Sequence, residues 1–229
     1  MPYSREAPSA RYTELLNMYN QVHTEGLADQ DIAAEDAFAG TSLTAHLPLI
    51  RSLIRSTGAK TLLDYGSGKG VKYQATDIVV KGERAKTVQA YWGLDSITCF
   101  DPGYPPFAAV PSGTFDAVIC TDVLEHIPDL DLPWMLEEQF RFARKFVFGN
   151  IAAYPAEKTL PNGENAHCTI EQAPWWHDLI KRAHAASGSK ADYLFMVETK
   201  VKVSKWFGLK TKFKPRYEYL SNRADWPPA

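Results

Sequence analysis

The sequence predicts an α/β fold: a doubly wound, mostly parallel sheet of about seven strands in a three-layer αβα arrangement, with an N-terminal helical cap. Three observations predict it. Short apolar segments alternate with helical segments of amphipathic pattern. The segment 61–65 reads as a buried strand that runs directly into the glycine-rich turn Gly66–Gly70. A separate amphipathic helix is predicted near the N-terminus, before this strand and its glycine turn. At 229 residues, the chain is long enough for one domain with a sizeable core.

Composition and charge exclude several classes of protein. The net charge of −2 gives no overall attraction to nucleic acid or to an acidic membrane. The three cysteines form no Cys-x-x-Cys pair, so neither a disulfide framework nor a zinc site is expected. The first residues lack the apolar core of a signal peptide, and no apolar run is long enough to cross a bilayer. We expect a cytoplasmic protein without a membrane partner.

Residues 1–41 are expected to form the cap or lid, and residues 42–229 the α/β domain. Five apolar and aromatic residues of the cap fall at helical spacing: Tyr12, Leu15, Leu16, Tyr19 and Val22. Tyr19 and His23 could cover a site, although core packing is the more common role for Tyr19. A second helix is predicted over 42–56, with a bend or break at Pro48. Gly58 then ends this helix before the strand.

The order of the later segments supports a mostly parallel sheet. After Gly70 we expect one long helix that reaches Tyr91-Trp92. The remaining elements are strands at 97–101, 115–121 and 145–150, helices at 132–143 and 174–186, and two late strands, 193–197 and 201–203, that could pair antiparallel. Strands that alternate with helices form right-handed crossovers. A further strand cannot be placed in the proline-rich segment 102–113.

Polar side chains follow three of the predicted strands. Asp64, Asp101 and the pair Thr121-Asp122 all lie where a strand ends. Because the carboxyl ends of parallel strands meet at one edge of a sheet, and ligands bind there, we expect these residues to converge on one crevice.

The glycine turn is compatible with only one of three known patterns. A phosphate-binding P-loop needs a glycine where the chain has Leu63, and Ser or Thr where it has Gly70. The dinucleotide fingerprint needs a third glycine where the chain has Val71. The pattern that remains is Asp-x-Gly-x-Gly-x-Gly. It resembles the first motif of class I S-adenosylmethionine (SAM)-dependent methyltransferases.

A second segment resembles the same family. Phe115-Asp116-Ala117-Val118 opens a strand that is followed by Leu124-Glu125-His126, similar to the family's fourth-strand motif. The resemblance covers about residues 42–150 and implies a Rossmann-like fold with SAM as cofactor. It places the amino-acid end of SAM at Asp64 and the turn, and the ribose at Asp101; Asp95 is the rival for the ribose. The complete cofactor-binding set is Asp64, Tyr65, Gly66, Ser67, Gly68, Gly70, Asp101, Thr121 and Asp122.

Some hydroxyl-directed relatives bind a divalent cation through a Glu-x-x-Glu-His run and a downstream histidine. This chain has Asp122-x-x-Glu125-His126, which helix geometry would place on one side, and His167 downstream. The resemblance implies Mg²⁺ or Mn²⁺ on Glu125, His126 and His167, and a catalytic role for Asp122, His126 and His167. A metal-free base, His126 or His167, is the alternative. In the simplest interpretation His126 packs at a helix start and His167 is an ordinary loop residue.

We therefore expect a SAM-dependent methyltransferase that acts on a small-molecule or glycan-like acceptor, at a hydroxyl. An NAD(P)-dependent oxidoreductase and a non-catalytic SAM-binding module are the alternatives. RNA methylation stays open because Lys200–Arg216 is basic and acid-free, although such a run is more typical of a solvated strand face. Trp175-Trp176-His177 could wall an acceptor pocket, but a core role is more common. Lys69 is expected to be a solvated turn residue.

Overall fold

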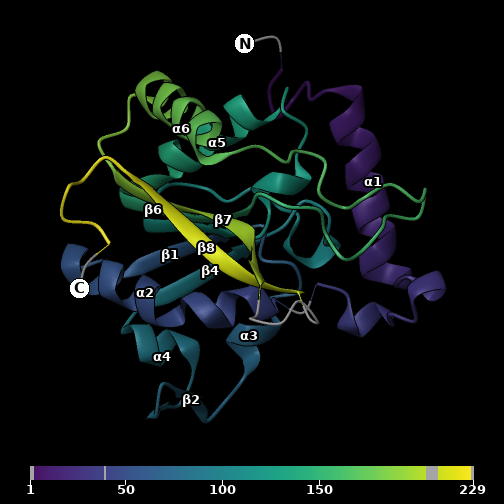
Figure 1. Ribbon diagram of the computed structural model, residues 1–229. Helices are drawn as coiled ribbons and strands as arrows, with labels where there is room; N and C mark the ends of the chain where they lie inside the picture. The colour runs from purple at the N-terminus through teal and green to yellow at the C-terminus, as the bar shows by residue number, and fades with distance from the viewer. Residues whose placement is uncertain (1–2, 39, 205–210, 228–229) are drawn as a thin grey trace.

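The computed structural model describes residues 3–38, 40–204 and 211–227. A six-stranded sheet forms the centre of the Rossmann-like α/β fold, with helices on both faces (Figure 1). Along the sheet the strand order is β4-β1-β5-β6-β7-β8, and every adjacent pair is parallel except β7 and β8. The strands are β1 (Thr61–Tyr65), β4 (Ser96–Phe100), β5 (Phe115–Thr121), β6 (Ala143–Ala152), β7 (Asp192–Ser204) and β8 (Thr211–Ser221).

Buried apolar side chains on both faces hold the layers together. One face of the sheet packs on α5 (Leu132–Phe142) and α6 (Ala173–Ser187), with Trp176 fully buried there. The other face packs on α2 (Thr41–Thr57) and α4 (Val88–Trp92). Pro48 lies inside α2, and the helix continues past it. Burial on both faces explains why the central strands read as continuous apolar runs.

The N-terminal segment lies across the carboxyl edge of the sheet. Its helix α1 (Ala10–Glu25) is followed by two short 3₁₀ turns, η1 (Ala28–Gln30) and η2 (Ala34–Asp36). Arg5 is anchored on Glu138 and Tyr65 and lies over the rings of Phe100 and Trp134. Further on, Ser9 bonds to Asp131, and the Gln30 side chain bonds to Thr159. The cap is thus fastened to the α/β domain at several separate points.

The single long helix expected after Gly70 is wrong. The chain instead forms a four-residue helix α3 (Val71–Gln74), a small antiparallel hairpin of β2 (Ile78–Val80) and β3 (Glu83–Ala85), and then α4. The hairpin turns at Lys81-Gly82, both with positive φ, a conformation in which glycine carries little steric cost. The central sheet has six strands because no strand forms in the proline-rich 102–113 segment, where only the turn η3 (Pro105–Phe107) appears.

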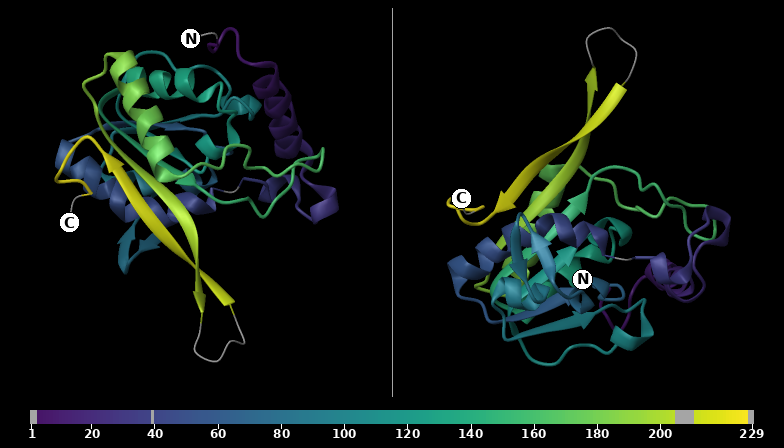
Figure 2. Two further views of the ribbon diagram at one scale, coloured as in Figure 1. Left: turned by 45° about the horizontal axis from the view of Figure 1, so that its top comes forward. Right: turned by 90° about the horizontal axis from the view of Figure 1, so that it is seen from below.

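The late strands also differ from expectation. Segments 193–197 and 201–203 belong to one strand, β7, which is parallel to β6. Its antiparallel partner is β8, which the sequence did not reveal as a strand. Beyond the sheet the two form a two-stranded ribbon that projects from the body of the protein (Figure 2). Lys205 and Lys210 of the basic run lie outside the described residues.

Candidate functional site

The glycine turn is shaped by contacts with the neighbouring strands. Gly66 has φ of 85°, and a β-carbon there would lie 2.4 Å from Cγ2 of Val123, so the position admits little else than glycine. The backbone N–H groups of Gly66 and Ser67 donate to the carbonyl oxygen of Phe100, at 2.8 and 3.1 Å. The turn is therefore fixed against the end of β4.

Asp64 lies at the carboxyl end of β1 with one carboxylate oxygen unused. The Tyr73 hydroxyl donates to Oδ2 at 2.6 Å, whereas Oδ1 is buried without a partner among the described residues. Burial raises the pKa of Asp64 to about 7, a shift that the Tyr73 hydrogen bond opposes and the charge of Asp101 reinforces. A buried acceptor without a donor is costly, so this oxygen is suited to a positively charged or hydrogen-bonding ligand.

Asp101 follows β4 and faces the same turn. Its Oδ2 accepts from the Gly68 N–H at 2.8 Å and its Oδ1 from the Gly103 N–H at 2.9 Å. Burial raises the pKa of Asp101, and these backbone hydrogen bonds oppose the rise. Each oxygen keeps a second lone pair for a ligand. Asp95, the rival candidate, is exposed just before the amino end of β4, at the opposite end of the strand.

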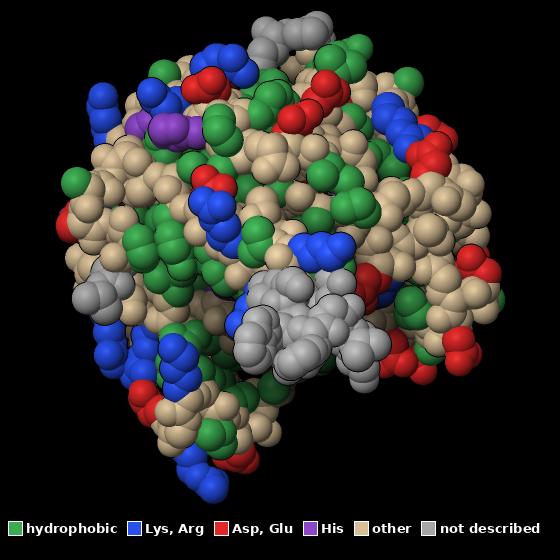
Figure 3. All heavy atoms as spheres, in the orientation of Figure 1, with side chains coloured by type: hydrophobic (Ala, Val, Ile, Leu, Met, Phe, Trp, Pro, Cys, Tyr) green, Lys and Arg blue, Asp and Glu red, His purple; other side chains and the backbone are tan. Residues whose placement is uncertain are grey.

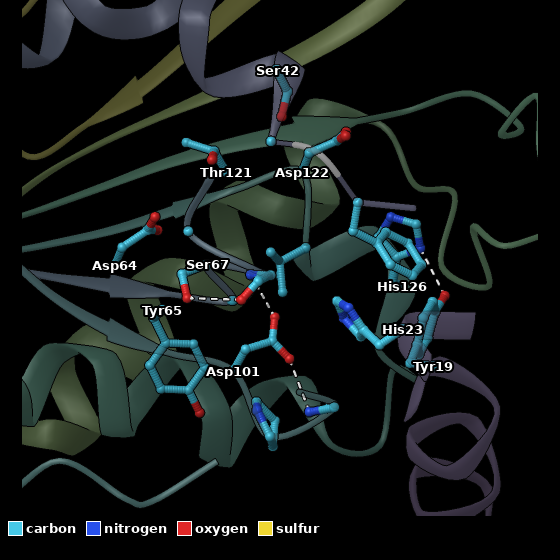
Figure 4. A pocket seen from close by; sticks show the side chains of 18 of the residues that line it. Tyr19, His23, Ser42, Asp64, Tyr65, Ser67, Asp101, Thr121, Asp122 and His126 are labelled. Atoms are coloured by element: carbon cyan, nitrogen blue, oxygen red, sulfur yellow. Dashed lines mark hydrogen bonds between the residues drawn. The ribbon is translucent and has the colours of Figure 1, made fainter. Parts of the chain in front are cut away.

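These side chains line one cavity of about 370 Å³ beneath the cap. Figure 4 shows Asp64 and Asp101 on one side of it and Tyr19, His23 and His126 on the other. All nine residues expected to bind the cofactor line it. The hydroxyl of Tyr65 reaches Glu138, so this residue meets the cavity without using its polar group there. The carboxyl-end crevice expected from the strand order is thus present as a partly open cavity of a size typical of ligand sites.

The cap supplies aromatic walls. Tyr19 packs edge-on against Phe38, and the His23 ring lies between Phe38 and Tyr104, at centroid distances of 4.8 and 5.3 Å. Burial lowers the pKa of His23 to about 4, with the charge of Lys69 adding to the shift, so this imidazole is neutral at pH 7. The expectation for Lys69 is wrong: its ammonium group is part-buried and donates to the carbonyl oxygen of Ala34 in the cap.

His126 is held by the cap and by the loop that carries His167. Its Nδ1 lies 2.8 Å from the Tyr19 hydroxyl and 2.8 Å from the carbonyl oxygen of Ala166. A carbonyl can only accept, so Nδ1 carries the proton and Nε2 keeps its lone pair. Burial, followed by the neighbouring His167, lowers the pKa of His126 to about 4.

A second polar cluster lies beside His126. Ligand atoms of Asp122, Glu125 and His167 lie within 4.8 Å of one another. Glu125 accepts the Ala152 N–H through Oε1 at 2.8 Å, while its buried Oε2 has no partner among the described residues. Burial, reinforced by Asp122, raises the pKa of Glu125. Nδ1 of His167 lies 2.6 Å from the carbonyl oxygen of Tyr154, which leaves Nε2 as the free nitrogen.

The expected helix start at Asp122–His126 is wrong. Asp122 has φ of 60°, and a 3₁₀ turn, η4 (Leu124–His126), follows it. This backbone turns Asp122 and Glu125 toward His167, and His126 toward Tyr19. His126 is therefore not part of the group of candidate ligand atoms, although its ring lies 4.7 Å from that of His167.

Two further features differ in their contribution to the site. Trp175 and Trp176 pack on each other and on the core, and neither lines the cavity in the described part of the chain. Tyr73, Ser42 and Lys158 do line it. Sequence reasoning missed all three, because no motif marks them; only the fold brings them to the glycine turn.

No family model matches the chain. One solved structure, titled "DhpI-SAH complex structure", is 16% identical, with 90% of this chain and 79% of that chain covered and a TM-score of 0.31. No residue's role follows from so distant a likeness. No helix in the described residues combines the length and apolar character needed to cross a membrane.

Proposed function

We propose that this protein is a SAM-dependent methyltransferase that methylates a hydroxyl group. The observation that carries the proposal is the unpartnered Oδ1 of Asp64, buried beside a glycine turn at the carboxyl edge of the sheet. An α-ammonium group would satisfy this oxygen. The two motifs that resemble class I methyltransferases lie on the same cavity.

The residues present fit such a cofactor. Asp64 would hold its ammonium group, and Asp101 would accept hydrogen bonds from its ribose hydroxyls. When bound, SAM supplies a methyl group already activated by a sulfonium. The chain must then exclude water and align the acceptor with the methyl–sulfur bond. Tyr19, His23 and Phe38 of the cap cover the cavity and suit the first task. Their aromatic faces would also stabilise the positive charge of the sulfonium.

Two features could promote deprotonation of an acceptor hydroxyl, one by accepting its proton and the other by lowering its pKa so that water can take the proton. The free Nε2 of neutral His126 is one, since its Nδ1 is occupied by the Ala166 carbonyl. The other is a divalent cation, Mg²⁺ or Mn²⁺, on Asp122, Glu125 and His167; a bound cation would lower the pKa of the hydroxyl. The unpartnered Oε2 of Glu125 and the oriented His167 ring fit a cation. The ligand set implied by the sequence was Glu125, His126 and His167; in the structure Asp122 takes the place of His126.

Chelation tests the cation. Treatment with EDTA should abolish turnover of SAM to S-adenosylhomocysteine (SAH), and added Mn²⁺ should restore it. His167→Ala should reproduce the loss without weakening SAH binding, because His167 belongs to the cluster but does not line the cavity. His177→Ala, on α6 and outside both the cluster and the cavity lining, should change neither. Full activity in EDTA would end the proposal of a cation and leave His126 as the base.

The alternatives from other classes make different predictions. An NAD(P)-dependent oxidoreductase would bind NAD and not SAH at equilibrium. A non-catalytic SAM-binding module would bind SAH but release none from SAM with any acceptor. We propose a compact hydroxyl-bearing acceptor, from a small molecule or a glycan-like compound. RNA is the remaining option for the acceptor, because its ribose hydroxyls are chemically similar to those of a glycan. Binding of RNA by the ribbon of β7 and β8 would favour this option.

A further inference from the structure

The ribbon formed by β7 and β8 extends past the carboxyl edge of the sheet, the same edge that carries the candidate site. β7 is parallel to β6, and it continues beyond the last residue pair that joins the two strands, Ala152 and Glu198. From there to the end of the described residues it pairs only with β8. Figure 2 shows this part projecting from the body of the protein. Its surface is assigned no role by the proposed function.

One face of the ribbon carries exposed aromatic residues beside lysines. Opposed residues of an antiparallel pair lie on the same face. Phe213 opposes Lys202, and Pro215 opposes Lys200. Tyr217 and Tyr219 continue this row along β8. Phe213 is 63% exposed and Tyr219 46% exposed, although large aromatic side chains are usually buried.

Positive charge is concentrated on the same segment. Lys200, Lys202, Lys214 and Arg216 are all exposed, the first two on the aromatic face and the other two on the opposite face. The sequence contains no acid between Lys200 and Arg216. Figure 3 shows basic side chains scattered over the face of the molecule across which the ribbon runs, with hydrophobic and acidic ones among them. Lys200 forms one ion pair, with Glu157 at 4.0 Å, and Glu157 is itself largely exposed. Such a pair is too weak to neutralise the ribbon.

The aromatic row is continuous with the candidate site. The Lys200 ammonium group lies 4.1 Å from the centre of the Tyr154 ring, and Tyr154 donates a hydrogen bond to Glu198 at 3.0 Å. The carbonyl of Tyr154 in turn holds His167. A chain-like ligand on the ribbon could therefore continue toward the Asp122–Glu125–His167 cluster.

We propose that this ribbon binds a single-stranded nucleic acid. Cationic side chains that follow a backbone, interleaved with aromatic rings on which bases stack, are the features that bind single strands without sequence preference. A second copy of the chain is a poorer occupant, because Pro215 and the basic residues of edge strand β8 oppose strand pairing.

A binding measurement with a short fluorescein-labelled single-stranded RNA tests the ribbon. We expect a change in anisotropy on binding, and an affinity that falls with salt with a log–log slope of about −1.4 if Lys200 and Lys202, the cations on the aromatic face, each displace counterions. The double substitution Lys200→Gln and Lys202→Gln should reduce the slope by about 1.4. Phe213→Ala should weaken binding roughly 5- to 100-fold through one lost base stack. Because these side chains are exposed, the variants should fold.

The matched control is on the other hairpin. Lys81→Gln with Arg84→Gln removes two exposed charges from the β2–β3 hairpin and should leave RNA binding unchanged. An absence of RNA binding would overturn the proposal. The proposal would also be overturned if the control variant lost as much RNA affinity as the ribbon variants, or if the protein bound heparin as tightly as RNA. A dimer in sedimentation that depends on Phe213 would overturn it as well. This proposal goes beyond the proposed function, which SAH binding tests separately: RNA binding can fail while SAH binding holds, and the reverse.

Discussion

Cofactor binding should depend on pH through Asp64. Burial gives this carboxyl a pKa of about 7, and its unpartnered Oδ1 is where we place the cofactor's ammonium group. Only the ionised carboxylate pairs with an ammonium. At pH 8 most of the protein has Asp64 ionised, and at pH 6 only about a tenth does. If the bound carboxylate stays ionised throughout, SAH should bind about tenfold more weakly at pH 6 than at pH 8.

Isothermal titration calorimetry of SAH at several pH values measures this directly. Near pH 7, two buffers of different protonation enthalpy should report the release of about half a proton per SAH bound. Asp64→Asn should bind SAH weakly and with little pH dependence. Asp95→Asn, an exposed carboxylate before the other end of β4, should behave as the parent. An affinity that is constant between pH 6 and pH 8, or an equal pH dependence in Asp64→Asn, would refute the reasoning.

The same shift predicts a sign for stability without ligand. The folded-state pKa of Asp64 is above the ordinary value of 3.8 for an aspartate, so the unfolded chain loses this proton first as the pH rises. Between about pH 4 and pH 7 this group therefore makes folding progressively less favourable. The difference in free energy of unfolding between Asp64→Asn and the parent, measured in urea, should therefore shift in favour of the variant from pH 5 to pH 8. A relative stability that does not change with pH would contradict the shifted pKa.

Three further substitutions test separate contacts. Gly66→Ala should lose about 1–3 kcal/mol more stability in urea than Gly82→Ala, because both have φ of 85° but only Gly66 has a neighbour, Val123, within 4 Å of the added carbon; equal losses would mean that the close contact has no cost. Ser9→Ala removes the N-cap of α1 and should cost about 1 kcal/mol and weaken SAH binding; unchanged SAH affinity would separate the cap from the cofactor. Tyr19→Phe should lower kcat about five-fold with SAH affinity retained, and an unaltered kcat would remove Tyr19 from the positioning of His126.

Much of the parallel sheet could be predicted because its signals are local. The segment 61–65 ends in a glycine turn, and 115–121 is a continuous apolar run. The position of each strand and the residue at which it ends can therefore be predicted from short windows of sequence. The strand-end positions of Asp64, Asp101 and Asp122 follow in turn from parallel topology. Convergence on one cavity therefore needed no knowledge of side-chain packing.

The features that were missed depend on tertiary contacts or on turn chemistry. β8 was not expected because its sequence alternates basic residues with aromatic residues and a proline, and only pairing with β7 makes it a strand. The Lys81-Gly82 turn breaks the helix expected after Gly70. The positive φ of Asp122 redirects the whole Asp122–His126 segment. Lys69 looked solvated because the cap carbonyl that it bonds, that of Ala34, is distant in sequence.

The central claim is that the cavity at Gly66–Gly70 binds SAM. Equilibrium titration with SAH, with NAD as the competing ligand, tests it most directly. Tight binding of SAH, its loss in Asp101→Ala with the fold retained, and no displacement by NAD are the predicted results. Tight binding of NAD without any binding of SAH would contradict the claim.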